Sequence, residues 1–412
     1  MIVFAVALAV IQYVDRVCIA KAMPTIRSEL HFSDIATGYI FGAFTLAYAL
    51  FEIPSGWLGD RFGPRKVLLR VVLWWSAFTA ATGWVASATA MVVVRFLFGA
   101  GEAGCFPNVT KAFTAWLPRR EWFRAQAVLW VSARWGGAAT PLLVVWVLGL
   151  TSWRVAFQMF ALLGILWAVA FFFWFRDNPQ EHRSVNAAER QLLAQNAALE
   201  SREAPIPWQL FLRSPTAWLL WLQYAVLSYV WYFYITWFPT YLDSVNHGRL
   251  GPAVLALLAG LPLFGGGFGS LIAAALEAPL GRILKSEARS RKAIAVVGFL
   301  AAATCFLASI YARDPVRMAV LIGFAGLFND FVLPSSWGTC MDVGGRFAGT
   351  VAGSMNMMGN IAGFVAPVVG GYILQTTHGH YEIFLYSMAG MYLLGVLCWP
   401  FINPTKPLEA IA

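Results

Sequence analysis

The sequence has little charge for its length. Of its 412 residues, only 12% are Asp, Glu, Lys or Arg, whereas 59% are hydrophobic. A soluble globular domain usually has about 25% charged residues. So little charge excludes a water-soluble surface and indicates an integral membrane protein. The net charge of +9 does not indicate nucleic-acid binding, because the basic residues form no continuous tract.

Cysteine is also scarce, and motifs for catalysis are missing. The cysteines lie in apolar segments without metal-site spacing, so we expect small buried residues rather than disulfides or metal ligands. They are Cys18, Cys105, Cys305, Cys340 and Cys398. The sequence contains no phosphate-binding loop, metal-ligand cluster or nucleophile triad. These absences argue against an ATP-driven pump or a membrane enzyme, and we expect no enzymatic activity, cofactor or metal.

Long apolar runs make up most of the chain. A bilayer-spanning helix needs about 20 mostly apolar residues, and twelve runs of spanning length occur in two sets of six. They lie at roughly 1–24, 34–58, 67–88, 90–117, 123–150, 153–175, 209–241, 252–276, 292–311, 316–340, 347–376 and 381–403. The predicted fold is an all-α membrane protein with twelve transmembrane helices. We expect one six-helix bundle at 1–175, a cytoplasmic linker at 176–210 and a second bundle at 211–405.

Lys and Arg are distributed unevenly between the two sides of the membrane. Counted over alternate loops, nineteen basic residues lie on one side and five on the other. Because cytoplasmic loops are enriched in Lys and Arg, both termini are predicted to be cytoplasmic. The remaining basic residues lie within predicted spans: Arg16, Lys21, Arg95, Lys111 and Arg134. We expect Lys21 and Lys111, nearer the span ends, to reach towards the membrane interface.

The loop after the second predicted span contains a specific motif. It reads GWLGDRFGPRK and fits G-x-L-x-D-R-x-G-x-R-K at every fixed position. The positions of interest are Gly56, Asp60, Arg61, Gly63, Arg65 and Lys66. The glycines permit a tight turn and close helix approach, the aspartate can face a helix end, and the basic residues hold the loop at an anionic leaflet. The motif is that of the major facilitator superfamily, in which this loop acts as a gating latch.

Charged residues inside the predicted spans need a partner or a wet cavity. A charge at the centre of a span costs about 2.5–3.5 kcal/mol on insertion scales. Asp15 and Arg16 are neighbours in the first span and point about 100° apart, so each needs a partner on another helix. Arg95 and Glu102, two turns apart in the fourth span, share one face, and Arg134 lies in the fifth.

Two interpretations of these charges compete. They can form a buried ion-pair network that fixes helix packing, or they can line a cavity that binds an anion and transfers a proton. An excess of cations over carboxylates favours the second, because an unpaired buried cation is costly and the arginine fork binds a carboxylate well. Burial favours the neutral acid and a nearby arginine favours its ionised form. Glu102 could therefore alternate between a protonated and an arginine-paired state, as in a proton symporter.

Four segments carry a more specific resemblance that covers nearly the whole chain. YVDR in the first span, GWLGDRFGPRK, RFLFGAGEAGCFPN in the fourth span and SMNMMGNIAGFVAP in the eleventh resemble the anion:cation symporter family of the superfamily. That family includes bacterial galactonate, glucarate and hexuronate transporters and the animal sialin and vesicular glutamate carriers. The resemblance implies two pseudo-symmetric bundles with a substrate site between them at the midplane. It implies a proton-coupled symporter of a small organic anion, such as a sugar acid, working as a monomer in the bacterial inner membrane.

The resemblance also assigns roles to residues. Asp15 and Glu102 would be protonation sites, with Asp15 turned towards the fourth span and Arg95 as the switching partner. Substrate-binding residues would be Arg16, Tyr48, Arg134, Ser335, Ser336, Trp337, Asn356 and Asn360. Asn356 and Asn360 share a helix face and suit a polyol, although hydrogen bonding between helices is an alternative.

Three departures from the family pattern and several alternatives remain open. Arg134 replaces a small or amide residue and could accept a dianionic substrate, whereas Asp330 adds a carboxylate in the tenth span that could form a further ion site. Glu52 lies near the cytoplasmic end of the second span. Other functions are a uniporter, a sodium-coupled carrier or an exchanger of another carboxylate or phosphate-type anion. A sensor on the same scaffold is a different class.

Overall fold

The computed structural model describes residues 1–117, 119–189, 212–312, 314–344 and 348–403. Its helices are α1 (Ile2–Leu30), α2 (Asp34–Phe62), α3 (Pro64–Thr82), α4 (Ala88–Glu102), α5 (Cys105–Trp116), α6 (Arg119–Leu150), α7 (Trp153–Trp174), the short 3₁₀ helix η1 (Pro179–Glu181), α10 (Pro215–Ile235), α11 (Phe238–Asn246), α12 (Pro252–Ile283), α13 (Glu287–Ile310), α14 (Pro315–Gly344), α15 (Ala348–Thr376) and α16 (Tyr381–Cys398). Each predicted span corresponds to one long helix or to two consecutive helices. The all-α fold is confirmed.

Ten helical segments among the described residues are long and apolar enough to cross a membrane. The two other predicted spans correspond to α3 and α10, with 19 and 21 residues. Their length suffices for a bilayer, but α3 begins with several basic residues and α10 is rich in Trp and Tyr, which makes both less apolar. A count of membrane-spanning helices that uses hydropathy alone therefore misses α3 and α10.

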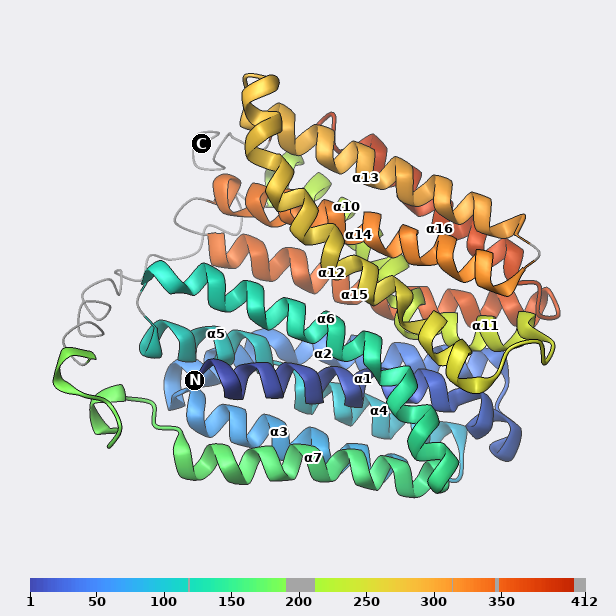
Figure 1. The fold of residues 1–412 in the computed structure, drawn as a ribbon, viewed down its shortest axis with the longest axis horizontal. Helices are drawn as coiled ribbons and strands as arrows, with labels where there is room; N and C mark the ends of the chain where they lie inside the picture. Colours follow the sequence, from blue (N-terminus) through green and yellow to red (C-terminus); the bar gives the residue numbers. More distant parts are fainter. Residues whose placement is uncertain (118, 190–211, 313, 345–347, 404–412) are drawn as a thin grey trace.

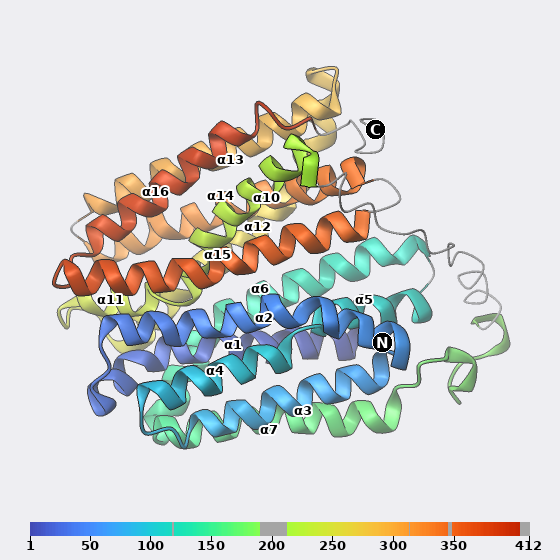
Figure 2. The same cartoon turned by 180° about the vertical axis from the view of Figure 1, so that it is seen from behind.

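The helices form two groups (Figure 1). Helices α1 to α7 lie on one side of the molecule and α10 to α16 on the other, and the view from behind shows the same division (Figure 2). We call these groups the first and second halves. Helix α2 of the first half packs along α15 of the second, and α6 packs along α12. The interface between the halves therefore consists mainly of these two helix pairs. The predicted boundaries of the linker stay a prediction, because residues 190–211 lie outside the described residues.

Two predicted spans are each broken into two helices. The fourth is interrupted at Gly104, which has a φ of +86° and packs so closely that a Cβ there would lie 2.3 Å from the Cβ of Ser55. The seventh is interrupted at Thr236 and Trp237, between α10 and α11. The continuous spans predicted at 90–117 and 209–241 are therefore wrong in this detail. Both breaks lie beside the interior site described below.

The two ends of the molecule differ in how the halves meet. Helix α1 begins and α16 ends at the same end (Figure 1), which we call the terminal end; the opposite end is the distal end. Near the distal end α2 and α15 touch through glycines. A Cβ on Gly38 would lie 2.5 Å from the carbonyl oxygen of Pro367, and one on Gly371 would lie 2.5 Å from that of Asp34. We call this backbone contact the distal seam.

Polar side chains also join the halves towards the distal end. Lys21 Nζ of α1 lies 3.0 Å from both carboxylate oxygens of Asp243 in α11. The hydroxyl groups of Tyr39 and Tyr372 lie 3.1 Å apart between α2 and α15. The two halves are thus closed against each other at this end.

The loop between α2 and α3, predicted to act as a latch, contacts residues at the end of α7 and just after it. Gly63, with a φ of +84°, makes the turn between α2 and α3. The backbone N–H of Arg65 donates to Asp177 Oδ1 at 2.8 Å, and its guanidinium donates to the carbonyl of Phe172. Arg61 and Lys66 are exposed. Gly56 and Asp60 lie in α2, but their side-chain surroundings lie outside the described part of the structure, and the gating role stays a prediction.

Candidate functional site

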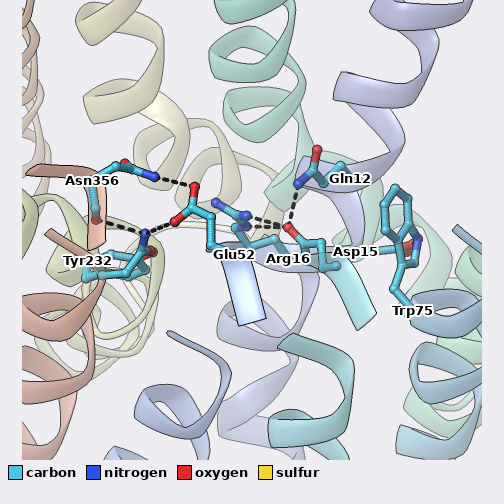
Figure 3. Close-up of polar contacts among 9 residues, drawn as sticks. Gln12, Asp15, Arg16, Glu52, Trp75, Tyr232 and Asn356 are labelled. Carbon is cyan, nitrogen blue, oxygen red and sulfur yellow. Dashed lines mark hydrogen bonds and ion pairs between the residues drawn. The ribbon is translucent and has the colours of Figure 1, made fainter. Parts of the chain in front are cut away.

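Arg16 and Glu102 form a buried ion pair in the first half (Figure 3). Arg16 Nε donates to Glu102 Oε1 at 3.0 Å, and its Nη2 contacts the same oxygen. Gln12, one turn earlier on α1, donates to this oxygen at 2.7 Å. Glu102 is fully buried and Arg16 is 8% exposed. The expected partner of Glu102, Arg95, is therefore replaced here by Arg16, which reaches it from another helix.

Asp15 points away from this pair, as expected for its neighbour along a helix. Trp75 Nε1 of α3 donates to its Oδ2 at 3.1 Å, and its Oδ1 has no hydrogen-bond partner among the described residues. Its hydrogen-bonded partner in this structure comes from α3, and the expectation that Asp15 turns towards the fourth span stays a prediction. Asp15 is thus a buried carboxyl group without an ion pair in the described structure.

Arg95 has no ion pair or hydrogen-bonded side-chain partner within the described ranges. Its guanidinium carbon lies 4.3 Å from the centre of the Phe98 ring and 5.4 Å from that of Phe44. It borders a small cavity between the halves, with room for about one water molecule. The cavity lining also includes Arg16 from the first half and Tyr232 and Thr236 from the second. A cation of the first half therefore faces polar groups of the second.

Aromatic rings surround the Arg16 guanidinium. Its carbon lies 4.9 Å from the ring centre of Phe44, 5.1 Å from that of Tyr48 and 5.3 Å from that of Tyr13. Tyr48, predicted to contact substrate, is buried at the centre of α2. Rings at these distances stabilise a cation without neutralising it.

Asn356 and Asn360 of the second half bind a carboxylate of the first half. Asn356 Nδ2 donates to Glu52 Oε1 at 2.7 Å, and Asn360 Nδ2 lies 3.4 Å from Glu52 Oε2. The Tyr232 hydroxyl donates to Asn360 Oδ1 at 2.8 Å. The predicted shared face is observed, and its contact in this structure is the alternative one, hydrogen bonding between helices.

Ser335, Ser336 and Trp337 lie on α14 and are turned towards their own half. Ser336 Oγ donates to Gln223 Oε1 of α10 at 3.0 Å, and Trp337 packs edge-on against Tyr224, also of α10. Ser335 is buried. In this structure these three predicted residues are not brought together with the Arg16–Glu102 pair by any described contact.

Arg134 and Asp330 form a second ion pair, which joins the halves. Arg134 Nε of α6 lies 2.8 Å from Asp330 Oδ2 of α14, and the guanidinium carbon lies 4.7 Å from the Trp231 ring centre. Asn329 Nδ2 donates to the other carboxylate oxygen at 3.0 Å. Arg134 and Asp330, which the sequence left as separate possibilities, are thus partners here.

The two intramembrane lysines both have polar partners in this structure. Lys21 contacts Asp243, and Lys111 Nζ donates to the Gly59 carbonyl at 3.1 Å near the end of α2. The predicted excess of basic residues over carboxylates inside the membrane is therefore not observed for the region as a whole. Glu52, Asp243 and Asp330 supply additional carboxylates, and within the described ranges Arg95 is the intramembrane arginine without one.

Sequence reasoning missed three residues of this region as site residues. Gln12 could have been found, because a residue four positions before Arg16 shares its helix face. Glu52 was noted only as a departure. Asp243 gave no signal, since it follows the predicted end of the seventh span. Of the cysteines, Cys18, Cys105, Cys340 and Cys398 are buried and Cys305 is half-buried.

The family of the chain follows from a sequence comparison. A family model described as Major Facilitator Superfamily matches residues 5–367. This chain belongs to the major facilitator superfamily. It is a membrane transporter and not an enzyme, as the motif in the loop between α2 and α3 predicts.

Relatives within the superfamily are organic-acid transporters. The chain is 34% identical over 405 residues to a "Probable sulfoacetate transporter" of Cupriavidus necator, covering 97% of this chain and 92% of the relative. It is 30% identical over 375 residues to a "Probable L-galactonate transporter" of Escherichia coli K12, covering 90% and 82%. These relatives confirm the predicted resemblance to transporters of small acids.

Solved structures support the fold. The crystal structure of a D-xylose-proton symporter matches with a TM-score of 0.75 at 11% identity, covering 98% of this chain and 97% of the symporter. A bacterial homologue of the human lysosomal transporter Spinster, in an inward-facing conformation, matches with a TM-score of 0.72 at 19% identity, covering 97% and 93%. At such low identity these matches show the fold alone.

Proposed function

We propose that this transporter is a proton-coupled symporter that imports a small organic anion by alternating access. The observation that carries the proposal is Arg95, a buried guanidinium with no carboxylate partner in the described structure, beside a cavity between the two halves. A buried unpaired cation is costly, and an anionic substrate would offset that cost. The Arg16 fork at the same cavity can bind a carboxylate or sulfonate through two parallel hydrogen bonds.

The substrate is expected to be a small acid. Relatives of this chain are named as probable transporters of L-galactonate and sulfoacetate. Sugar acids such as hexonates and hexuronates are therefore candidate substrates, and so are short sulfonates. Tyr48, Asn356 and Asn360 supply hydroxyl and amide groups for the polar part of such a molecule. Because the cavity has room for only about one water molecule, the halves must separate around the site before a substrate enters.

Proton coupling is proposed to use Glu102 and Asp15. A substrate anion that takes the Arg16 guanidinium from Glu102 leaves a buried carboxylate without a cation. That carboxylate then takes up a proton, because burial favours the neutral acid. Asp15, bonded to Trp75 and lacking an ion pair in the described region, is a second proton site, and Arg95 would receive whichever carboxylate is ionised.

The orientation of the protein in the membrane is proposed from the distribution of basic residues. We propose that the terminal end is cytoplasmic, that the distal end faces outwards and that the protein works as a monomer in a bacterial inner membrane. The distal closure of the structure then separates the site from the outside. Rocking of the halves about the site would open each end in turn.

The first prediction concerns transport and its coupling. Purified protein in liposomes with an inward proton gradient should accumulate galactonate or sulfoacetate. The variant Glu102→Gln cannot exchange a proton, so gradient-driven accumulation should be lost while exchange of labelled for unlabelled substrate continues. Both are measured as uptake of radiolabelled anion.

Three outcomes separate the alternatives. If no anion of a broad carboxylate and sulfonate panel moves, the transport proposal is wrong and a sensor is favoured. Accumulation that follows sodium rather than protons, or that needs a counter-anion inside, identifies a sodium-coupled carrier or an exchanger. Unchanged accumulation by Glu102→Gln removes Glu102 from coupling.

A further inference from the structure

Glu52 is a carboxylate of one half whose hydrogen bonds all go to the other half. It lies on α2, and its described side-chain partners are the amides of Asn356 and Asn360 on α15, at 2.7 and 3.4 Å. Figure 3 shows the Glu52 carboxylate between Asn356 and the Arg16 guanidinium. The contact thus lies inside the proposed substrate site and is separate from the distal seam.

Glu52 has no ion pair among the described residues. A carboxylate inside a membrane span normally has a cation as partner. Helix α15 contains no charged residue at all, and the cation beside Glu52 in Figure 3, Arg16 on α1, is bound to Glu102. Within the described part of the chain, the other titratable groups in electrostatic range of Glu52 are Tyr48 on its own helix and Tyr224 and Tyr232 on α10. Glu52 is therefore held by neutral donors.

The donors that hold Glu52 form a site for an acidic group. Asn356 presents an N–H to one carboxylate oxygen and Asn360 presents an N–H towards the other. Asn360 is oriented by the Tyr232 hydroxyl, which donates to its Oδ1. A substrate carboxylate or sulfonate has the same pair of oxygen acceptors and could take the same donors. Arg16 lies on the opposite side of this position, so an anion here would have amide donors on one side and a guanidinium on the other.

We propose that Glu52 is an internal ligand of the substrate site. In the substrate-free transporter its carboxylate occupies the amide donors of Asn356 and Asn360, and an acidic substrate displaces it. The displaced carboxylate loses its hydrogen bonds in a partly buried position, and it takes up one proton from water in the opened cavity to become the neutral acid. Substrate binding is then a competition between two acidic groups. This inference rests on the proposed function, because it requires an anionic substrate.

The test is a binding measurement on the full-length purified protein. The probe is galactonate or sulfoacetate, whichever the wild type transports. Isothermal titration calorimetry in buffers of different ionisation enthalpy gives both the affinity and the number of protons taken up. Glu52→Gln keeps the size but removes the competing charge, so affinity should rise about tenfold. Proton uptake on binding should fall by about one proton.

A matched control removes a different contact between the same two helices. Tyr39→Phe removes the hydrogen bond to Tyr372 near the distal end and should leave affinity and proton uptake as in the wild type. If Glu52→Gln does not fold, Glu52→Asp replaces it. The shorter aspartate side chain cannot reach both amides, so the proposal predicts that Glu52→Asp also binds the substrate more tightly than the wild type.

The results distinguish the two proposals. Unchanged or weaker binding by the Glu52 variants, with normal transport by the wild type, overturns the internal-ligand proposal and leaves the transport function intact. An equal gain in affinity in Tyr39→Phe also overturns it, because any loosening of the halves would then suffice. If the wild type neither binds nor transports any anion of the panel, the proposed function fails and the internal-ligand proposal fails with it.

Discussion

At the scale of single residues, Arg134 and Asp330 form a buried ion pair between the halves. Asp330 has a side chain that is 3% exposed, and that of Arg134 is 12% exposed. Such a pair adds little stability compared with well-packed apolar residues, but removal of one partner leaves a buried charge uncompensated. The stability of the protein should therefore respond strongly to Asp330 and weakly to carboxylates in exposed pairs.

The variant Asp330→Asn tests this. It leaves the Arg134 guanidinium without a counter-ion and should lower the free energy of unfolding by about 3–5 kcal/mol. The control is Glu29→Gln, which breaks the more exposed pair of Glu29 with Arg154 and should lower the free energy of unfolding much less, because solvent screens an exposed pair. Unfolding of the purified proteins in detergent, followed by temperature or denaturant, gives both values. Similar losses in the two variants would show that Arg134 is neutralised in another way.

Sequence reasoning at this scale found the charged residues and expected the fourth span to supply partners for Asp15 and Arg16, but it did not give the individual pairs. Asp15, Arg16, Glu102 and Arg95 are all buried, as the cost of charge in a span predicts. Hydropathy and helical period give the depth and face of a residue, but they do not show which of two long arginine side chains reaches a given carboxylate. The partner of Lys21, Asp243, lies 222 positions away, and no local pattern indicates it.

At the scale of elements, the break between α4 and α5 positions Glu102. The helix ends at Glu102, and Gly104 turns the chain into α5 with a positive φ. Two conditions require glycine here, the left-handed backbone and the close contact with Ser55. The break therefore ties the depth of Glu102 to the packing of α2 against α4.

The variant Gly104→Ala should be destabilised by about 1–3 kcal/mol and should transport poorly, because relief of the clash moves Glu102. Gly390→Ala is the control. Gly390 lies within α16, and a Cβ there meets nothing within 4 Å, so alanine should be neutral or slightly stabilising. Melting temperature and anion uptake check both variants. Equal behaviour of the two would show that the α4–α5 turn tolerates a side chain.

The sequence predicted the elements well except at these interruptions. The bounds of most spans agree with the helices within a few residues, since an apolar run in a membrane has to be helical. The sequence predicts one continuous span at 90–117, because GAGEAG does not by itself show that the helix is interrupted at Gly104. Its positive φ arises from contact with α2, which no single-span pattern contains.

At the scale of the whole molecule, the contacts that close the halves are concentrated from the distal end to the level of the site. The seam of Gly38 and Gly371 lies towards the distal end, and the Lys21–Asp243 pair also joins the halves there. If the halves rock about the site, this pair must break whenever the distal end opens. Weakening it should favour the state open at that end.

The variant Asp243→Asn tests this at the distal end. A cysteine introduced by Thr236→Cys at the cavity should react about fivefold faster with a membrane-impermeant maleimide added from outside, since loss of about 1 kcal/mol shifts the equilibrium by that factor. The control is Arg154→Gln, which breaks a pair within the first half. An equal increase in both variants would show general loosening rather than opening between the halves.

The overall architecture was predictable, whereas the relation of the halves was not. Twelve apolar runs and one loop motif suffice for the fold, because the membrane restricts the chain to packed helices. Which end is closed depends on contacts such as Tyr39 with Tyr372, between residues 333 positions apart. Such contacts are made in one state of a carrier and broken in another, so a sequence that serves every state does not specify one of them.

The distal seam has a consequence for the energy balance of a cell. A membrane that stores energy as an ion gradient is discharged by any continuous thread of water, even a brief one. At Gly38 and Gly371 the backbone of α2 packs directly against the backbone of α15. A backbone contact cannot be opened by a change of side-chain rotamer. Thermal motion of side chains therefore cannot separate α2 from α15 there, and the contact opens only when these helices move as units. Close backbone packing at these glycines should therefore limit ion leakage between α2 and α15, which preserves the membrane potential between transport cycles.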